Sequence, residues 1–245
     1  MKVIAVIPAR YGSTRFKGKP LAMICGKPMV QYVYENAVRC KIVDRVVVAT
    51  DDETIQKVVE GFGGEVFITK ATHETGTDRV AEVARHYQAQ FIVNLQGDEP
   101  LLPPTAIEDA VLPLLEDNRI VMSTLKTKLR DQCEATNPNI VKVVTDHHGY
   151  ALYFSRSPIP YHYEDADRVV FFRHIGLYVY TRAFLMTFTQ LPQTKLEKAE
   201  RLEQLRALEH GYRIRVVETA YSPIGVDVPE DIEHVERILK QRANR

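Results

Sequence analysis

A cationic, glycine-containing loop follows the first apolar run of the chain, residues 3–7, which stops at Pro8. Four cations lie within residues 10–19, in company with Ser13, Gly12 and Gly18: Arg10, Arg15, Lys17 and Lys19. A short apolar run that ends at a proline is typical of a buried strand. Glycine lets the backbone approach a ligand closely, and cations neutralise phosphate oxygens. The pattern predicts a polyphosphate cradle, and a solvated basic turn is the alternative.

A carboxylate follows another apolar run. The run at 91–95 leads into QGDEP at 96–100, which places Asp98 just beyond a buried strand. Ligands of open parallel sheets bind beyond the carboxyl ends of the strands, so we expect Asp98 near the basic loop. There, a Mg²⁺ ion would bridge Asp98 to phosphate. A carboxylate that caps the next turn is the alternative, and the facing cations favour the metal.

Asp227 is the second acidic candidate. It lies in GVDVPED, residues 225–231, between a loop and a helix-like segment. Local evidence alone favours Asp227 as the N-cap of that helix over a metal ligand.

Several further polar residues are candidates on weaker evidence. In TGTDR, residues 75–79, Thr77 or Asp78 is expected to cap a helix, so that Arg79 faces outward or into a cleft. His174 lies within the apolar strand FFRHIGLYVY, where a histidine is usually a satisfied or exposed side chain.

One polar pair is predicted on a single helix, 195–209, that ends at Gly211. Glu200 and Gln204 are spaced to share a face, which leaves them free for a substrate hydroxyl or for water. Arg156 follows a predicted hairpin strand.

The elements that must position these residues change character along the chain. Strand-like runs at 3–7, 46–50, 65–68 and 91–95 alternate with helix-like stretches at 29–41, 53–62, 78–88 and 105–116. This alternation predicts βαβ units and a parallel sheet. From about residue 120 the runs at 120–125, 140–145, 150–155 and 169–181 are strand-like, and 140–155 reads as an antiparallel hairpin. A strand at 213–218 and a helix from about Pro229 follow. We expect one α/β domain, 1–245, with an antiparallel insertion around 120–190.

The composition of the chain argues against some classes of protein. The chain has 245 residues, and its 32 Lys and Arg balance its 32 Asp and Glu. A net charge of zero argues against a protein that coats nucleic acid or a membrane. No apolar run reaches the length of a membrane span. The three cysteines lack metal-ligand spacing and are expected to be reduced thiols. Together these features predict a cytoplasmic protein.

Seven segments in one order carry a family resemblance: IPARYGSTRFKGKP, TGTDR, NLQGDEP, the stretch 142–160, RHIGLYVY, LEQLR and GVDVPED. In these the chain resembles the 3-deoxy-manno-octulosonate cytidylyltransferases, also called CMP-Kdo synthetases. The resemblance implies a nucleotidyltransferase fold, a mostly parallel Rossmann-type sheet with an antiparallel insertion, and a homodimer. It implies the reaction CTP + Kdo → CMP-Kdo + diphosphate, which supplies lipopolysaccharide synthesis, with Mg²⁺ as cofactor.

The resemblance also implies residue roles. Arg10, Ser13, Arg15 and Lys19 would hold the CTP phosphates, and Asp98 and Asp227 would bind Mg²⁺, which reverses the local preference for Asp227 as a cap. The catalytic group would be Asp98, Asp227, Lys19 and Arg10. The nucleotide and sugar sites would be lined by Gln96, Arg79, Arg156, His174, Glu200 and Gln204. Family members commonly have proline at the position of Lys17 and serine at that of Thr75, and neither difference removes a proposed ligand.

Two other functions remain open. The same chemistry on another acidic sugar, 8-amino-Kdo or a sialic acid, would use the same basic loop and aspartates. A catalytically silent module would bind CTP without releasing diphosphate. A sequence-specific nucleic-acid binder is disfavoured because the chain has neither a basic surplus nor a recognisable reading helix.

Overall fold

The described residues form two compact units. A computed structural model describes residues 1–12, 16–129, 131–163 and 169–243. The first unit comprises Met1–Glu108 and Ser222–Arg245, and the second comprises Asp109–Tyr221. The second unit therefore extends beyond the predicted insertion on both sides, and its first boundary falls within helix α4 (Pro104–Glu116). That the chain acts as a single domain stays a prediction.

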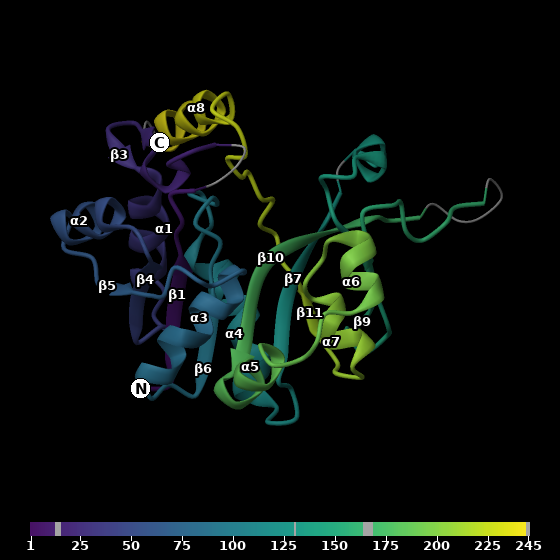
Figure 1. Ribbon diagram of the computed structural model, residues 1–245. Helices are drawn as coiled ribbons and strands as arrows, with labels where there is room; N and C mark the ends of the chain where they lie inside the picture. The colour runs from purple at the N-terminus through teal and green to yellow at the C-terminus, as the bar shows by residue number, and fades with distance from the viewer. Residues whose placement is uncertain (13–15, 130, 164–168, 244–245) are drawn as a thin grey trace. The chain divides into compact units, whose positions relative to one another are not determined.

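A four-stranded parallel sheet forms the centre of the first unit (Figure 1). Its spatial order is β6 (Phe91–Asn94), β1 (Val3–Pro8), β4 (Arg45–Thr50) and β5 (Val66–Ile68). Residues 3–7 of β1 are all buried, as expected for a parallel strand that is covered on both faces. From β1 the chain moves outward through β4 and β5, then returns past β1 to form β6. The crevice between the ends of β1 and β6 is therefore the switch point at which such sheets bind ligands.

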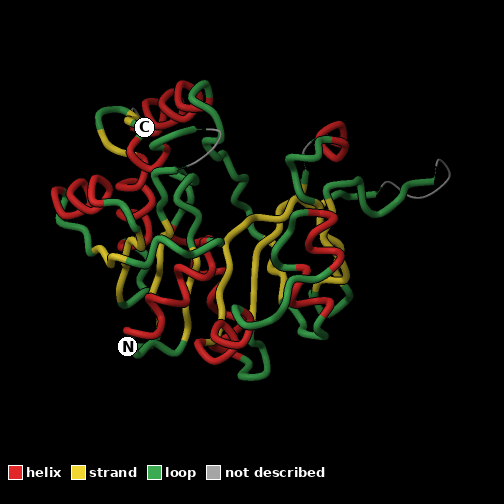
Figure 2. The backbone as a smooth tube through the Cα atoms, in the orientation of Figure 1, coloured by secondary structure: helices red, strands yellow, loops and turns green. Residues whose placement is uncertain are grey.

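Helices of the first unit connect or cover these strands (Figure 2). They are α1 (Met29–Val38), α2 (Glu53–Gly61), α3 (Gly76–His86) and α8 (Asp231–Ala243), with a 3₁₀ turn at Lys19–Leu21 and a ribbon of β2 (Met23–Ile24) and β3 (Lys27–Pro28). Asp52 caps α2 through its side chain. The cap of α3 is Thr75, not Thr77 or Asp78 as we predicted. Asp78 instead completes a reciprocal capping box with Thr75, which fixes the turn before the helix.

The second unit is built around mixed strands. In it, β10 (Phe172–Thr181) pairs antiparallel with β7 (Met122–Lys128), and β11 (Arg215–Glu218) pairs parallel with β7. The hairpin of β8 (Lys142–Thr145) and β9 (Ala151–Ser155) adds to β10 through β8. This confirms the predicted antiparallel hairpin and shows that β11 runs parallel to its neighbour. Short helical segments complete the unit: a 3₁₀ turn at Gln132–Thr136, α5 (Arg182–Phe188), α6 (Lys195–Glu200) and α7 (Leu205–Glu209).

The predicted single helix over 195–209 is wrong. Arg201 adopts a left-handed conformation (φ +52°) that ends α6, and α7 starts at Leu205. A buried ion pair explains the break: Arg206 donates to both carboxylate oxygens of Glu197 over 2.9 and 2.5 Å. A continuous helix would separate these residues by about 13 Å along its axis. Glu200 and Gln204 therefore do not share a helix face.

In the described part of the chain, no helix has both the length and the apolar character that crossing a membrane requires.

Candidate nucleotide and sugar sites

The predicted cradle lies in the first unit, at the end of β1 and β6. A cavity of about 290 Å³ is lined from the loop after β1 by Pro8, Arg10 and Lys19, and from the loop after β6 by Gln96 and Asp98. The two loops pack closely, since a Cβ on Gly97 would lie 3.4 Å from the Pro8 carbonyl oxygen. The structure thus brings four of the predicted site residues together at the switch point of the sheet.

Gly18 sets the direction in which Lys19 leaves the basic loop. Its φ of +70° is in the left-handed region, and it directly precedes the 3₁₀ turn that Lys19 begins. The N–H of Gly18 donates to the Tyr11 carbonyl over 2.9 Å. A Cβ at Gly18 would come within 3.3 Å of the Tyr11 ring, so the position suits glycine for two reasons. Ser13 and Arg15 lie outside the described residues.

Lys19 connects the two candidate metal ligands. Its ammonium lies 2.6 Å from Asp98 Oδ2 and 3.3 Å from Asp227 Oδ1. The lysine side chain is 12% exposed, whereas the carboxylates of Asp98 and Asp227 are 35% and 56% exposed. The two acidic side chains therefore face one shared, solvent-accessible space.

Asp227 is not a helix cap in this structure. Helix α8 starts at Asp231, whose carboxylate accepts from the N–H groups of Asp227 and Val228 over 2.7 and 3.0 Å. The Asp227 side chain faces Lys19. The local preference for an N-cap was wrong, since α8 starts at Asp231. The metal role that the family resemblance implies for Asp227 stays a prediction.

These carboxylates suit a hard cation. A lysine ammonium, itself a cation, already lies between them, and carboxylate oxygens are the ligands that Mg²⁺ prefers. Among the described residues, no three His, Cys, Asp or Glu side chains group as a metal site. An ion held here would therefore complete its coordination with water and phosphate oxygens, as Mg²⁺ commonly does.

Arg10 and Arg79 have different surroundings. Arg10 is exposed, lines the cradle and donates to the Glu74 carbonyl over 2.9 Å. Arg79 is fully buried: its guanidinium donates to Thr69 and lies 3.1 Å from Asp51. The prediction that Arg79 faces outward or into a cleft was wrong. A charge with no exposed surface needs an internal partner, and Asp51 at the end of β4 supplies it.

The other four predicted site residues belong to the second unit. Arg156 and Glu200 contact each other: Arg156 Nε donates to the Glu200 carbonyl over 2.7 Å, and the Glu200 carboxylate accepts from Ser155 Oγ and the Arg156 N–H. Arg156 also donates to the Pro138 carbonyl over 2.8 Å. Most of its hydrogen-bonding capacity is therefore used within the protein.

Lys142 is a buried residue that sequence reasoning missed. Its ammonium donates to the carbonyls of Asn137, Ile140 and Arg156 over 3.0, 2.6 and 2.5 Å, and the residue is 0% exposed. Burial lowers its pKa. The only signal was a lysine inside the apolar run VKVVT. The ammonium ties the loop before β8 to the residue that follows β9.

His174 is buried and neutral. Burial, reinforced by the charge of Arg173, lowers its pKa to about 3. The Thr124 hydroxyl donates to the Leu177 carbonyl over 2.8 Å and lies 2.9 Å from His174 Nε2. Thr124 therefore accepts from Nε2–H, and Nδ1 is left as the acceptor.

Gln204 is 4% exposed, and its buried Nε2 has no hydrogen-bond partner among the described residues. An unpartnered buried amide donor is costly. Gln204 therefore differs from Glu200, whose carboxylate is satisfied.

Comparison with known proteins places the chain in a family. A cytidylyltransferase family model matches residues 4–214. Two curated relatives are named 3-deoxy-manno-octulosonate cytidylyltransferase. The protein of Geobacter sulfurreducens is 55% identical over 98% of this chain and 100% of its own length, and that of Syntrophotalea carbinolica is 58% identical over 98% and 99%. The chain belongs to the 3-deoxy-manno-octulosonate cytidylyltransferase family.

Solved structures agree with this membership. A CMP:2-keto-3-deoxy-manno-octonic acid synthetase complexed with CTP superposes with a TM-score of 0.94, is 43% identical, and covers 99% of this chain and 100% of its own. A cytidylyltransferase from Leptospira borgpetersenii is 18% identical with a TM-score of 0.67, over 98% of this chain and 87% of its own, and supports the fold alone. As a 3-deoxy-manno-octulosonate cytidylyltransferase family member, the chain is a nucleotidyltransferase with the α/β fold that its sequence predicted.

Proposed function

We propose that the chain transfers CMP from CTP to 3-deoxy-manno-octulosonate (Kdo), with release of diphosphate. One observation carries the proposal: the Lys19 ammonium joins Asp98 and Asp227 at the ligand-binding end of the sheet. The names of full-length relatives and the CTP complex of a structural neighbour support the choice of substrates.

The step is a displacement at phosphorus. The anomeric hydroxyl oxygen of Kdo forms a bond to the α-phosphorus of CTP, the bond to the bridging oxygen of diphosphate breaks, and the hydroxyl proton passes to solvent. Arg10 and Lys19 provide positive charge where the phosphate oxygens gather, and Gln96 provides a neutral amide beside them. Fixed cations that stabilise developing charge lower the barrier because they need no reorganisation during the reaction.

Asp98 and Asp227 would hold the Mg²⁺ ion. When bound, the ion supplies charge neutralisation at the phosphates and acidifies the attacking hydroxyl. In its absence the single positive charge of Lys19 offsets part of the negative charge of the two carboxylates. We expect Lys19 to exchange these partners for phosphate oxygens when nucleotide and metal arrive.

In the second unit we propose unequal roles for the sugar-site candidates. Gln204 has an unused amide donor, and neutral His174 offers Nδ1 as an acceptor. Both suit sugar hydroxyls. Arg156 and Glu200 are better explained as positioning residues, because they satisfy each other and nearby backbone groups.

The test is diphosphate release with CTP and a panel of acidic sugars: Kdo, 8-amino-Kdo and a sialic acid. We expect turnover with Kdo that is lost when Mg²⁺ is chelated. Faster turnover with another sugar would support CMP transfer from CTP but contradict Kdo as the acceptor. CTP binding without diphosphate release from any sugar would identify a silent nucleotide-binding module.

We further propose a cytoplasmic homodimer that serves lipopolysaccharide synthesis. The second unit exposes Leu152, Tyr161 and Tyr163 by 62, 79 and 72%, which is high for apolar and aromatic side chains. Sedimentation equilibrium of the wild type and of Leu152→Glu tests the assembly. A monomeric wild type would contradict it.

A further inference from the structure

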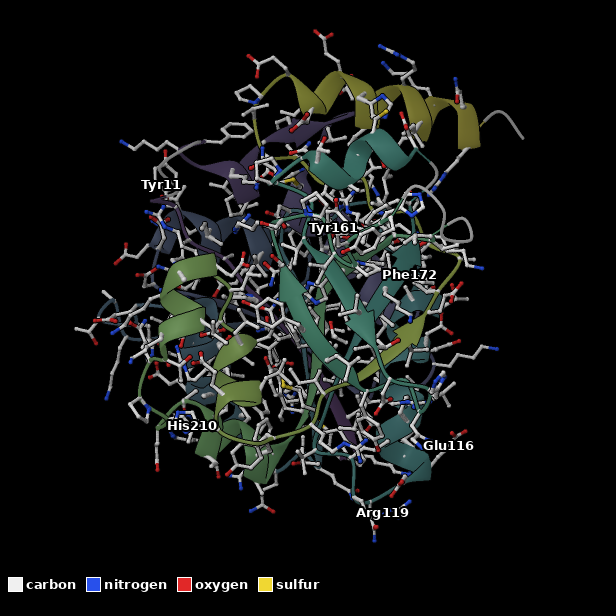
Figure 3. All side chains as sticks on the ribbon, turned by 90° about the vertical axis from the view of Figure 1, so that its right-hand side faces the viewer. Tyr11, Glu116, Arg119, Tyr161, Phe172 and His210 are labelled. Carbon is white, nitrogen blue, oxygen red and sulfur yellow. The ribbon has the colours of Figure 1, made fainter. Side chains whose placement is uncertain are left out.

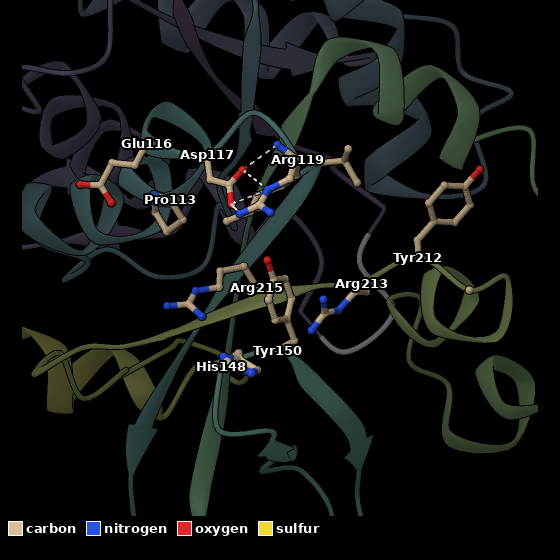
Figure 4. A pocket seen from close by; sticks show the side chains of 12 residues that line it. Pro113, Glu116, Asp117, Arg119, His148, Tyr150, Tyr212, Arg213 and Arg215 are labelled. Carbon is tan, nitrogen blue, oxygen red and sulfur yellow. Dashed lines mark hydrogen bonds and ion pairs between the residues drawn. The ribbon is translucent and has the colours of Figure 1, made fainter.

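A cavity of about 780 Å³ lies within the second unit and shares no residue with the sites described above (Figure 4). Its lining comes from the segments that lead into β7 and β11 and from the β8–β9 turn. Figure 3 places its residues Glu116 and Arg119 at the lower end of the view, whereas Tyr161 and Phe172 of the same unit lie higher. The cavity therefore lies at the opposite end of the hairpin from Lys142 and Arg156.

Three arginines line this cavity, and their charges are unequally compensated. Arg119 donates to both oxygens of Asp117, over 2.7 Å to Oδ2 and 2.9 Å to Oδ1. Arg213 has one contact with Asp146, at 3.2 Å. The guanidinium of Arg215, a residue that is only partly exposed, forms no hydrogen bond or ion pair with any described residue. The uncompensated positive charge is thus centred on Arg215.

Tyr150 holds two of these cations near each other. The guanidinium carbons of Arg213 and Arg215 lie 3.6 and 5.6 Å from the centre of its ring. Figure 4 shows them on either side of the ring, with the hydroxyl directed toward Arg119. That hydroxyl has no hydrogen-bond partner among the described residues. Cation–π contacts stabilise each guanidinium, yet the two like charges still repel, and a bound anion would relieve the repulsion.

The positive field extends beyond the cavity. Burial lowers the pKa of Lys126, and the charge of Arg215 acts in the same direction, against Glu218. His148, which is exposed at the cavity edge, adds a further polar donor.

We propose that this cavity binds a phosphate monoester, with Arg215 and Arg213 on the phosphate oxygens and the carbon body against Pro113 and Ile120. Guanidinium forks match phosphate geometry. The three terminal oxygens of a monoester match the donors of Arg215, Arg213 and the Tyr150 hydroxyl, whereas a carboxylate offers only two oxygens. The apolar wall favours an organic phosphate over the bare ion.

Calorimetric titration of the full chain with glycerol 3-phosphate tests the proposal. The Lys19→Met background weakens phosphate binding in the cradle, and acetate at equal ionic strength is the carboxylate probe. We expect one saturable site for glycerol 3-phosphate and weaker heat from acetate. Arg215→Gln should weaken binding about tenfold, the effect of one charge-assisted contact.

Two further variants separate the site from general electrostatics and from misfolding. Glu116→Gln removes an exposed negative charge from the cavity edge and should tighten binding two- to threefold, roughly the strength of a surface charge pair. Arg45→Gln removes an equal charge from the first unit and should leave the affinity unchanged. Thermal unfolding confirms that each variant is folded. The proposal is overturned if Lys19→Met abolishes all binding, if folded Arg215→Gln binds as tightly as its parent, or if acetate binds as well as the phosphate ester.

Discussion

The N–H of Val226 donates to the carbonyl oxygen of Asp98 over 3.0 Å. This one backbone bond fastens the segment before α8 to the loop after β6, and Gly225 packs with a Cβ position 3.6 Å from the same oxygen. The next residue along, Asp227, then faces Lys19 beside Asp98. Two acidic residues far apart in sequence are thus brought to one cation by main-chain geometry.

Asp98→Asn removes one of these carboxylates while keeping its shape. We expect diphosphate release to fall by about 10²–10³-fold, the cost of losing one preorganised charge at a reacting phosphate. Steady-state diphosphate release at saturating CTP, Kdo and Mg²⁺ measures it. Asp109→Asn, in α4, is the matched control and should retain wild-type turnover. Unchanged turnover in Asp98→Asn would contradict the proposal that Asp98 binds the metal ion.

Lys19→Met separates metal binding from catalysis. Without the ammonium, Asp98 and Asp227 repel each other and should bind Mg²⁺ several-fold more tightly in the absence of nucleotide, because the competing cation between them is gone. Turnover should fall by about 10²-fold or more, since the phosphate contact is lost. Calorimetry with Mg²⁺ alone gives the first quantity. Lys17→Met, which replaces an exposed lysine of the same loop, should change neither the Mg²⁺ affinity nor the turnover. Equal or weaker Mg²⁺ binding in Lys19→Met would argue that the two carboxylates do not share an ion.

Lys142→Met tests the buried ammonium that joins two loops. Three carbonyl oxygens lose a charged hydrogen-bond donor. The variant also no longer buries a charged ammonium, which offsets part of that loss. We therefore expect the free energy of unfolding to fall by about 1–3 kcal/mol. Urea unfolding measures it. Lys128→Met breaks only a surface pair with Glu218 and should cost less than about 1 kcal/mol. A variant of Lys142 as stable as the wild type would show that the three contacts contribute nothing net.

His174 makes stability depend on pH. Its pKa falls from 6.5 to about 3 on folding. Below pH 6.5 this histidine is therefore protonated in the unfolded chain but stays neutral in the folded chain. Stability therefore decreases as the pH falls through this window, and between pH 7 and pH 5 this group alone should remove about 2 kcal/mol. His174→Gln keeps a hydrogen-bond donor for Thr124 and should flatten the profile by that amount. His147→Gln, which replaces an exposed histidine, is the matched control in the same measurement. Parallel profiles for wild type and His174→Gln would mean that His174 is protonated in the folded chain.

The local pattern of the sequence determined most elements and the end of the sheet at which we expect ligands to bind. The apolar run at 3–7 predicted β1, and the alternation that follows it predicted the parallel sheet. The turn-forming sequence DHHG at 146–149 predicted the hairpin. Strand periodicity and turn chemistry are properties of neighbouring residues, so the sequence alone is enough for these elements. The seven ordered segments determined the family.

Only the tertiary structure decided how individual side chains are used. Whether Asp227 capped a helix or faced a cation depended on the Asp98 carbonyl, and whether Glu200 and Gln204 shared a helix depended on Glu197 and Arg206 meeting inside the protein. Arg79 and Lys142 look like surface residues by type, yet both are fully buried beside internal acceptors. Such outcomes rest on contacts between residues distant in sequence, where the cost of burying a charge is set by partners that no local pattern contains.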